Sequence, residues 1–320
     1  MSNVTLIIVN FNGGELLARC IGHVRAQTVL PDRVFVVDNA SVDGSIESLE
    51  PWERLTVLRM GSNLGFAAGN NRAIAACSTE YIALLNPDAF PAPDWIERLL
   101  DAASAWPLAA SFGSRQLSHD NPGLLDGVGD CYHMSGLAWR EAHGFPQTSM
   151  HLVPREIFAP CAAAALYRRN AVAGAGGFDE TFFCYFEDVD LGFRLRLAGH
   201  AARYVPDAVV EHIGGASTGG ERSDFAMFHG HRNLVWTFVK NVPGPLLIGL
   251  LPLHLLMNVA VVLLMAFQGH AGTAMRSKWQ AMLGLPAAWR ARRAVQHARI
   301  ASWWEIWRAL DKRLWPRPRG

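Results

Sequence analysis

The chain has 320 residues, of which 50% are hydrophobic and 18% are charged, so a disordered or low-complexity protein is excluded. Its 29 Lys and Arg nearly balance its 28 Asp and Glu, which gives a formal net charge of +1. The charge is distributed unevenly along the chain. Residues 270–320 carry 11 bases and 2 acids (net +9), whereas residues 1–269 carry 18 bases and 26 acids (net −8). The acidic body excludes a nucleic-acid-binding protein, and the basic tail predicts a surface with anionic partners.

The cysteines and the N-terminus both favour the cytosol. The 5 cysteines are scattered without a CxxC pair, and an odd, low count suits neither a disulfide scaffold nor a zinc site. The first residues, MSNVTLIIVNFN, have no basic region and no small-residue cleavage site. We therefore expect no signal peptide and a cytosolic body.

Apolar runs alternate with helical patterns in the first part of the chain. Strand-like runs lie at 4–9, 33–38, 55–60 and 81–86, and helical spacing at 15–27, 43–50, 66–77 and 94–106. This alternation predicts an α/β fold with a mostly parallel central sheet and helices on both faces. Ligands bind such sheets beyond the carboxyl ends of the strands. Three predicted strands end there in polar residues, which are Asn10 and Asn12, Asp38 and Asn39, and Asn86 and Asp88.

Later segments have a weaker pattern. Residues 111–155 are rich in Gly, His and Asp and predict irregular strands and loops, whereas 156–167 predict a strand region and 187–199 a helix. Residues 245–267 carry no charge over a length sufficient to cross a bilayer. The basic tail, 270–320, holds six of the 11 tryptophans, which are Trp279, Trp289, Trp303, Trp304, Trp307 and Trp315.

The strongest chemical signal lies in residues 177–199, GFDETFFCYFEDVDLGFRLRLAG. Acids stand there among aromatic residues, where partial desolvation can tune a carboxylate towards a general base. Asp190 and Arg194 are four residues apart, so they share a helix face and can simply pair. An acidic helix N-terminus stabilised by the helix dipole is the alternative interpretation.

Two strand ends carry weaker signals. In LLNPDA, residues 84–89, a rigid turn lies beneath Asp88, which suits a hard cation that bridges phosphates. Asn, Pro and Asp are also ordinary turn formers. In VVDNASVDGS, residues 36–45, Asp38 can accept hydrogen bonds from a base or a ribose, or the segment is only a turn and a helix cap.

Glycine and histidine supply the remaining candidates. In NLGFAAGNNRAIA, Gly65 and Gly69 flank a helix start, followed by Asn71, that can approach a phosphate. The spacing is neither GxGxxG nor a P-loop. We therefore reject dinucleotide and Walker sites. His212, in VVEHIGGAST, is the one histidine singled out as a ligand candidate. His229 and His231 precede Arg232 and face either an anionic ligand or solvent.

Taken in order, six segments resemble the GT-A-type inverting glycosyltransferases of family two. They are VTLIIVNFN, VVDNASVDGS, NLGFAAGNN, LLNPDA, GGFDETFFCYFEDVDLGFRLRLAG and EHIGGAS. The similarity is to the bacterial rhamnosyltransferase-like and galactofuranosyltransferase-like branch. It implies a GT-A catalytic domain over residues 1–240, with a nucleotide-sugar-binding half (1–110) and an acceptor and catalytic half (111–240). A hydrophobic, basic and Trp-rich helical region that associates with membranes would follow over 241–320.

The resemblance also implies roles for single residues. Asp188 would be the general base, with Glu187 beside it in the catalytic pair. Asp88 and His212 would bind Mg²⁺ or Mn²⁺ on the diphosphate, although Asn86 replaces the first acid of the family's DxD-type motif. The residues that would bind or organise the nucleotide-sugar are Asn10, Asn12, Asp38, Asn39, Gly65, Asn71, Asn86, Arg194 and Arg232.

The implied reaction needs one base and a stabilised leaving group. In-line attack by an acceptor hydroxyl inverts the anomeric carbon, and a metal neutralises charge on the departing nucleotide diphosphate. The implied donor is a dTDP- or UDP-linked sugar, with rhamnose as the candidate sugar. The implied acceptor is lipid-linked or a cell-surface polysaccharide.

Two alternatives stay open. Asn86 keeps a non-catalytic GT-A-fold carbohydrate-binding or scaffold protein in consideration. A nucleotidyltransferase is disfavoured because the loop after the first strand, Phe11–Glu15, lacks Lys and Arg. Homo-oligomerisation is left open.

The apolar stretch 245–267 predicts association with the cytoplasmic face of the inner membrane. Because the body of the protein is expected in the cytosol, a simple span would place the basic tail on the outer side of the membrane. This placement would oppose the positive-inside tendency. We therefore expect a monotopic or re-entrant insertion that breaks at Pro252, with the tail on anionic headgroups. A soluble helical subdomain or a dimerisation element is the alternative. Removal of residues 242–320 is then expected to release the protein into the soluble fraction.

Overall fold

The structure is a computed structural model that describes residues 2–215, 220 and 223–313. Trp315 and the end of the EHIGGAS segment, Ala216 and Ser217, lie outside the described residues. The strands are β1 (Val4–Asn10), β2 (Arg33–Asp38), β3 (Leu55–Arg59), β4 (Tyr81–Leu85), β5 (Ala89–Pro91), β6 (Ala109–Ser118), β7 (Leu125–Gly127), β8 (Asp130–Tyr132), β9 (Ala138–Arg140), β10 (Arg155–Ile157), β11 (Ala164–Arg168) and β12 (Ala201–His212). The helices are α1 (Gly14–Arg25), α2 (Gly65–Ala76), α3 (Trp95–Ala105), α4 (Arg169–Gly174), α5 (Glu187–Leu197), α6 (Asp224–Asn241), α7 (Gly244–Phe267), α8 (Ala271–His297) and α9 (Trp303–Ala309), with short 3-10 helices η1 (Ser149–Leu152) and η2 (Glu180–Phe182).

The predicted α/β fold is confirmed. The main sheet runs in the order β10-β12-β6-β11-β4-β1-β2-β3, with β5 beside β12 and β7 beside β6. Strands β1 to β4 pair in parallel, whereas β11 inserts antiparallel between β4 and β6. Strands β8 and β9 form a separate antiparallel hairpin, and all 5 cysteines are free thiols.

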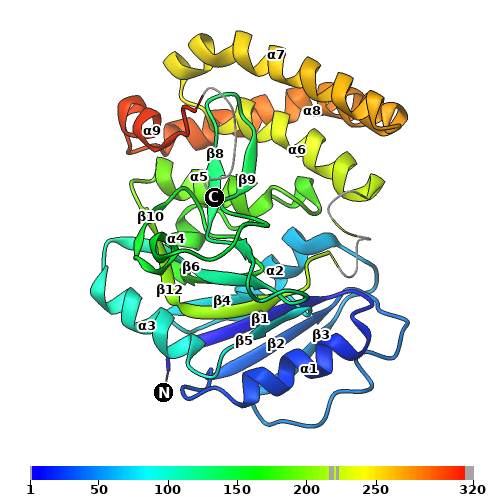
Figure 1. Ribbon diagram of the computed structural model, residues 1–320, viewed down its shortest axis with the longest axis vertical. Helices are drawn as coiled ribbons and strands as arrows, with labels where there is room; N and C mark the ends of the chain where they lie inside the picture. The colour runs from blue at the N-terminus through cyan, green and yellow to red at the C-terminus, as the bar shows by residue number, and fades with distance from the viewer. Residues whose placement is uncertain (1, 216–219, 221–222, 314–320) are drawn as a thin grey trace.

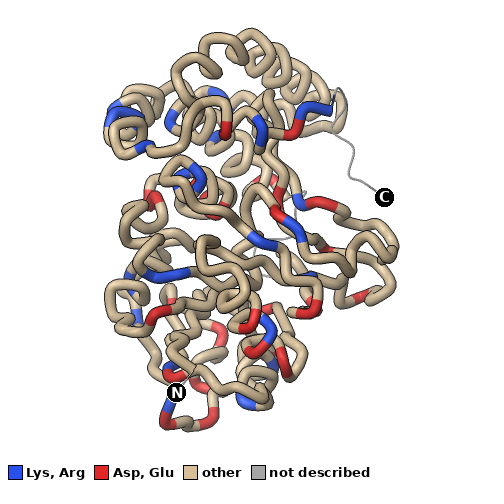
Figure 2. The backbone as a smooth tube through the Cα atoms, turned by 90° about the vertical axis from the view of Figure 1, so that its left-hand side faces the viewer, with Lys and Arg blue, Asp and Glu red and all other residues tan. Residues whose placement is uncertain are grey.

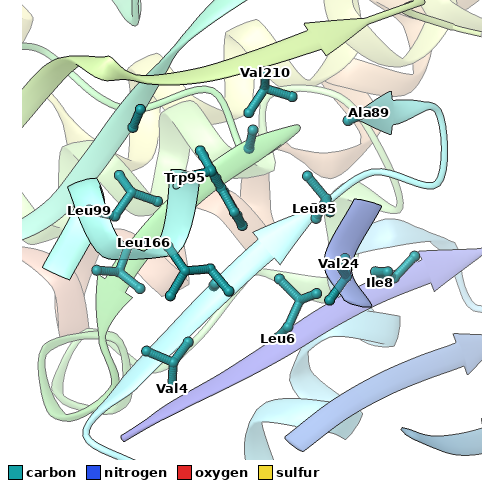
Figure 3. Close-up of a cluster of buried hydrophobic side chains, with 14 of the residues drawn as sticks. Val4, Leu6, Ile8, Val24, Leu85, Ala89, Trp95, Leu99, Leu166 and Val210 are labelled. Atoms are coloured by element: carbon teal, nitrogen blue, oxygen red, sulfur yellow. The ribbon is translucent and has the colours of Figure 1, made fainter. Parts of the chain in front are cut away.

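Strand β1 separates two apolar cores because its side chains alternate between the two faces of the sheet. Leu6 and Ile8 point to one face, where they join Val24 of α1 and Leu99 of α3 (Figure 3). Ile7 and its neighbours on the other face pack with α2, α4 and α5. Each fully buried aliphatic side chain stabilises the fold by roughly 1.5–3 kcal/mol.

The helix predicted over residues 43–50 is wrong, because these residues form turns. Asp43 accepts hydrogen bonds from the backbone N–H groups of Gly14 (2.7 Å) and Ser45 (3.1 Å), and Gly44 has a φ of 78°. Asp and Ser side chains that bond to nearby backbone offer the chain an alternative to a helix. The segment therefore packs as a turn against the start of α1.

The segment predicted as irregular strands and loops, 111–155, contains several strands, and the strand region predicted next to it was too coarse. Residues 109–118 form β6, a ten-residue strand with six buried residues in succession, and its pairings with β12 and β7 contain register shifts. The strand region expected over 156–167 divides into β10 and β11, which pair with different neighbours. The remaining predicted strands and helices lie within about two residues of their expected bounds.

The C-terminal helices form a layer on top of α5 (Figure 1). Phe238 of α6 and Phe193 of α5 belong to one hydrophobic cluster with Tyr132 of β8, and α8 lies between α6 and α7. Helix α7 continues through Pro252, so the break expected at this proline is wrong. A single proline removes one backbone hydrogen bond without ending a long helix that its neighbours support. The chain reverses instead at Gly269, which has a φ of 88°.

Helix α7 is anchored along one side and exposed along the other. His254 is 3% exposed, stacks on Phe238 with ring centroids 3.8 Å apart, and donates from Nδ1 to the carbonyl of Ser135 (2.7 Å). The outer side presents large apolar residues such as Ile248 (78% exposed) and Phe267 (91% exposed). Of the helices described, α7 is the one long and apolar enough to cross a membrane, and only 11% of its most apolar stretch is buried.

Candidate active site

A cavity of about 940 Å³ opens at the carboxyl ends of the central strands. Its walls come from the ends of β1, β4 and β12, from the β8–β9 hairpin, and from the loop and first turn of α5. Of the predicted site residues, this lining contains Asn39, Gly65, Asn86, Asp88, Glu187, Asp188 and His212. The topology therefore brings together residues from both halves of the chain.

Asp88 and His212 meet because β5 pairs antiparallel with β12, which places His212 opposite Ala89. Nε2 of His212 lies 3.3 Å from Oδ1 of Asp88, and 3.4 Å from Nδ2 of Asn86. Both Asp88 and His212 are buried. Their polar atoms converge at the edge of the cavity.

Asp126, which the sequence did not predict as a site residue, contacts His212 through the ring nitrogen that does not face Asp88. Nδ1 of His212 lies 2.8 Å from Oδ2 of Asp126, and Arg140 also pairs with that carboxylate. Burial opposes the imidazolium, but the carboxylates of Asp126 and Asp88 outweigh it and raise the pKa of His212 to about 9. Burial alone would raise the pKa of Asp126, whereas its bonds to His143 and His212 hold that pKa well below its usual range.

These residues fit a divalent cation that also binds substrate. Hard cations such as Mg²⁺ are bound through one or two carboxylates together with substrate phosphates. A ligating histidine characteristically donates its other ring N–H to a carboxylate, as His212 can to Asp126. In the described residues no group of three or more His, Cys, Asp and Glu side chains gathers into a complete cage. A metal here would therefore take the remaining ligands from phosphate or water, through Asp88 and His212.

Asp188 stands in the first turn of α5, at the wall of the cavity. Oδ2 accepts a hydrogen bond from the backbone N–H of Ala162 (3.1 Å), and Oδ1 one from the N–H of Val189 (2.8 Å). Burial raises the pKa of Asp188, and these N–H groups oppose the rise. Burial and then the charge of Asp188 raise the pKa of Glu187 well above its usual value.

Asp130, at the start of β8, is a cavity residue that sequence reasoning missed. It is 5% exposed, and burial followed by the charge of Asp188 raises its pKa well above the usual range. Asp126 and Asp130 both lie in the segment predicted as irregular strands and loops. Only their acidic character, within a Gly-rich stretch, was available as a signal.

Four of the predicted donor-binding residues lie at or after the ends of β1 and β2, and they fall into two groups. Asn39 lines the cavity and donates from Nδ2 to the carbonyl of Gly65 (3.1 Å). Asn10 instead donates to the hydroxyls of Ser41 and Ser45, and Oδ1 of Asp38 accepts from the N–H of Ser41.

The loop contacts of Asn12 complete this second group. Oδ1 of Asn12 accepts from the N–H of Val42 (2.9 Å). Asn10, Asn12 and Asp38 thus organise the turn behind the strand ends. None of the three is among the described residues that line the cavity.

Asn71, Arg194 and Arg232 also lie outside the lining among the described residues. Asn71 bonds to both backbone groups of Phe178, and Arg194 pairs with Asp190 (2.8 Å), as their spacing predicts. Arg232 donates to the carbonyl of Phe182 (2.8 Å). In the structure these three side chains brace the segment before and around α5.

Comparisons with known proteins agree with the fold and show the family. The glycosyl transferase family 2 model matches residues 5–174. The chain is 30% identical to an N-acetylglucosaminyl-diphospho-decaprenol L-rhamnosyltransferase of Mycobacterium tuberculosis, over 70% of this chain and 80% of that protein. It is 28% identical to the O-antigen chain rhamnosyltransferase RfbN of Salmonella typhimurium, over 65% and 66% of the two chains.

Two solved structures share the fold at low sequence identity. A mannosyltransferase from Pyrobaculum calidifontis, in complex with GDP-Man and Mn²⁺, superposes with a TM-score of 0.54 at 18% identity, covering 92% of this chain and 85% of that one. GalNAc-T7, solved with UDP, GalNAc and Mn²⁺, gives a TM-score of 0.59 at 16% identity, covering 74% of this chain and 47% of that one.

Proposed function

Because the chain belongs to glycosyl transferase family 2 and is a nucleotide-sugar glycosyltransferase, we propose that it transfers rhamnose to a hydroxyl of a lipid-linked or polysaccharide acceptor. The rhamnosyltransferases of M. tuberculosis and S. typhimurium support the sugar and the acceptor class. The observation that carries the proposal is the meeting of Asp188 with Asp88 and His212 around one cavity. The family match favours this function over a non-catalytic scaffold or a nucleotidyltransferase.

Asp188 acts as the general base in this proposal. Its carboxylate accepts the proton of the acceptor hydroxyl as the oxygen attacks the anomeric carbon. A raised pKa suits this task, because a base works best when its pKa approaches the working pH. The N–H groups of Ala162 and Val189 each bind one oxygen of this carboxylate and hold it at the wall of the cavity. Burial raises the pKa of Glu187, the neighbouring carboxyl, well above its usual value, and the charge of Asp188 raises it further.

The leaving group is handled on the side of Asp88 and His212. These residues would hold Mg²⁺ or Mn²⁺, which when bound neutralises the charge that develops on the departing diphosphate. Asp126 orients the ring of His212 through Nδ1. A nucleotide diphosphate leaves without protonation, so one carboxylate base is sufficient and the configuration inverts. The donor nucleotide in this proposal is dTDP or UDP.

The C-terminal layer supports a monotopic position on the cytoplasmic face of the membrane. The outer side of α7 is apolar, and tryptophans such as Trp279 of α8 and Trp304 of α9 are exposed beside it. In Figure 2 the coil at the top of the molecule carries no charged residue, whereas Lys and Arg lie beneath it. Apolar side chains with adjoining Trp and basic residues suit an interface with anionic headgroups. A lipid-linked acceptor would be within reach of such a position.

The substitution Asp188→Asn tests the function. Transfer from a dTDP- or UDP-sugar is expected to fall about 10²- to 10⁴-fold, the usual contribution of a general base. Donor binding, measured by calorimetry, is expected to remain. Glu180→Gln, at an exposed acid in the same segment, is the matched control. Transfer near the wild-type rate in the Asp188 variant would refute the assignment of the base.

A further inference from the structure

The loop in front of the catalytic pair has a strained backbone. Phe183, Tyr185 and Phe186 have φ values of 65°, 66° and 71°, although none of them is glycine. A left-handed conformation costs about 1–2 kcal/mol for an ordinary L-residue. Three such residues within four positions persist only where surrounding contacts enforce them. We call residues 183–186 the strained loop.

Asn233 of α6 supplies contacts that enforce this conformation. Its side chain is 0% exposed. Nδ2 donates towards three carbonyl groups, those of Phe182 (3.1 Å), Cys184 (3.0 Å) and Tyr185 (2.7 Å). One amide group from a neighbouring helix therefore binds two carbonyls of the strained loop and the carbonyl of Phe182 directly before it.

Arg232 determines which way the amide of Asn233 points. Its Nε, which can only donate, lies 2.9 Å from Oδ1 of Asn233. The amide nitrogen must then face the loop. The same guanidinium donates from its NH2 nitrogen to the carbonyl of Phe182 (2.8 Å), so both side chains act on one segment.

The strained loop adjoins both the catalytic pair and the donor-binding side of the cavity. All four of its residues line the cavity, and Glu187 and Asp188 follow it directly. On the donor side, the carbonyl of Phe183 accepts a hydrogen bond from the N–H of Ala67 (3.2 Å). A Cβ on Gly65 would lie 2.4 Å from that carbonyl oxygen. A shift of the loop would therefore displace the base relative to the donor.

We propose that Asn233 is a positioning residue for Asp188. It acts through the strained loop, which it holds in the left-handed conformation that begins α5 at the cavity wall. The inference rests on the proposed function of Asp188 as the base. A displacement of about 1 Å at a catalytic group can reduce the rate by about 10²-fold.

The experiment compares two variants of the full-length enzyme. Asn233→Asp keeps the shape but replaces the donor NH2 with an oxygen that faces three carbonyls. Thr237→Val is the matched control, because Thr237 lies one turn later on the same buried side of α6 and Val is isosteric. We expect kcat of the Asn233 variant to fall about 10- to 100-fold. The donor KM is expected to stay within about threefold, and the Thr237 variant to behave as wild type.

A second variant covers the case in which Asn233→Asp does not fold. Arg232→Met removes the donor that orients the amide, at a side chain of intermediate burial. A smaller loss of kcat, at unchanged donor KM, is expected. Wild-type kcat in folded Asn233→Asp would overturn the inference. If Asn233→Asp does not fold, a wild-type kcat in Arg232→Met would overturn the inference. A lowered Tm of Arg232→Met without any change in its kcat would also overturn the inference. Asp188→Asn in the same assay separates this failure from failure of the proposed function.

Discussion

A cluster of buried charges between α5 and α6 leads to a prediction about the thermal stability of the protein. Lys240 of α6, 2% exposed, pairs with Asp179 and lies 2.8 Å from Oδ1 of Asp190, which is 0% exposed. Asp190 is also bonded to Arg194 (2.8 Å) and Asn241 (2.7 Å). This cluster fixes α6 against the helix that carries the catalytic pair. The perturbation is Lys240→Met, which preserves most of the side-chain volume and removes the charge.

The size of the effect follows from the burial of the partners. Removing one partner of a buried ion pair costs about 3–5 kcal/mol. Asp190 keeps two other partners, and the side chain of Asp179 is 21% exposed, so we expect the lower end, about 3 kcal/mol. At about 2 °C per kcal/mol for a chain of this size, Tm falls by about 6 °C.

Acid should weaken the difference between the two proteins. Burial opposes ionisation of Asp179, but Lys240 outweighs it and lowers the pKa of Asp179 from its usual 3.8. The stability that this pair contributes is complete above that usual value and is lost as the pH falls through the lowered pKa. The gap in Tm between wild type and Lys240→Met is therefore expected to be constant near neutral pH and to narrow below about pH 4.

Differential scanning calorimetry at several pH values measures this effect. Arg98→Met is the control, since Arg98 pairs with Asp94 one turn away on the exposed side of α3 (2.9 Å). An exposed pair of this kind contributes about 0.3–0.5 kcal/mol. Equal Tm values for the Lys240 and Arg98 variants would refute the reasoning from burial.

Three further predictions concern donor binding and the membrane. Gly65→Ala places a Cβ against the carbonyl of Phe183 at a residue with a φ of 83°, so calorimetry should show weakened donor binding; wild-type affinity would contradict this. Leu255→Ser with Leu256→Ser removes exposed apolar residues, so sedimentation with phosphatidylglycerol vesicles should decrease at unchanged Tm; full sedimentation would argue against α7 as the contact. Deletion of residues 242–320 uncovers α6 and removes the segment bonded to β8, so we now expect aggregation, and a soluble, folded product would disprove it.

Local patterns in the sequence were sufficient for the four parallel strands β1 to β4 and for part of the cavity. Apolar runs ending in polar residues predicted strands with Asn39 and Asp88 at their carboxyl ends, because burial of a parallel strand requires an apolar stretch of a few residues. Helix α5 and its acid-rich start were also predicted, because helical periodicity is a property of neighbouring residues. The ordered motifs also led to the family.

Convergence of distant residues was decided by the tertiary structure alone. Asp126 meets His212 across 86 residues, and Asn233 reaches the carbonyl of Tyr185 across 48. Neither meeting leaves a periodic signal, because each depends on the packing of elements far apart in the chain. The turn at Asp43 was misread for a related reason, since its hydrogen bond to Gly14 exists only once β1 and β2 are paired. The sequence by itself determined where the apolar strands and helices lie and that Asp88, Asp188 and His212 are site candidates, because these follow from composition, local period and motifs. Strand register and helix packing determined which of those residues act on one another.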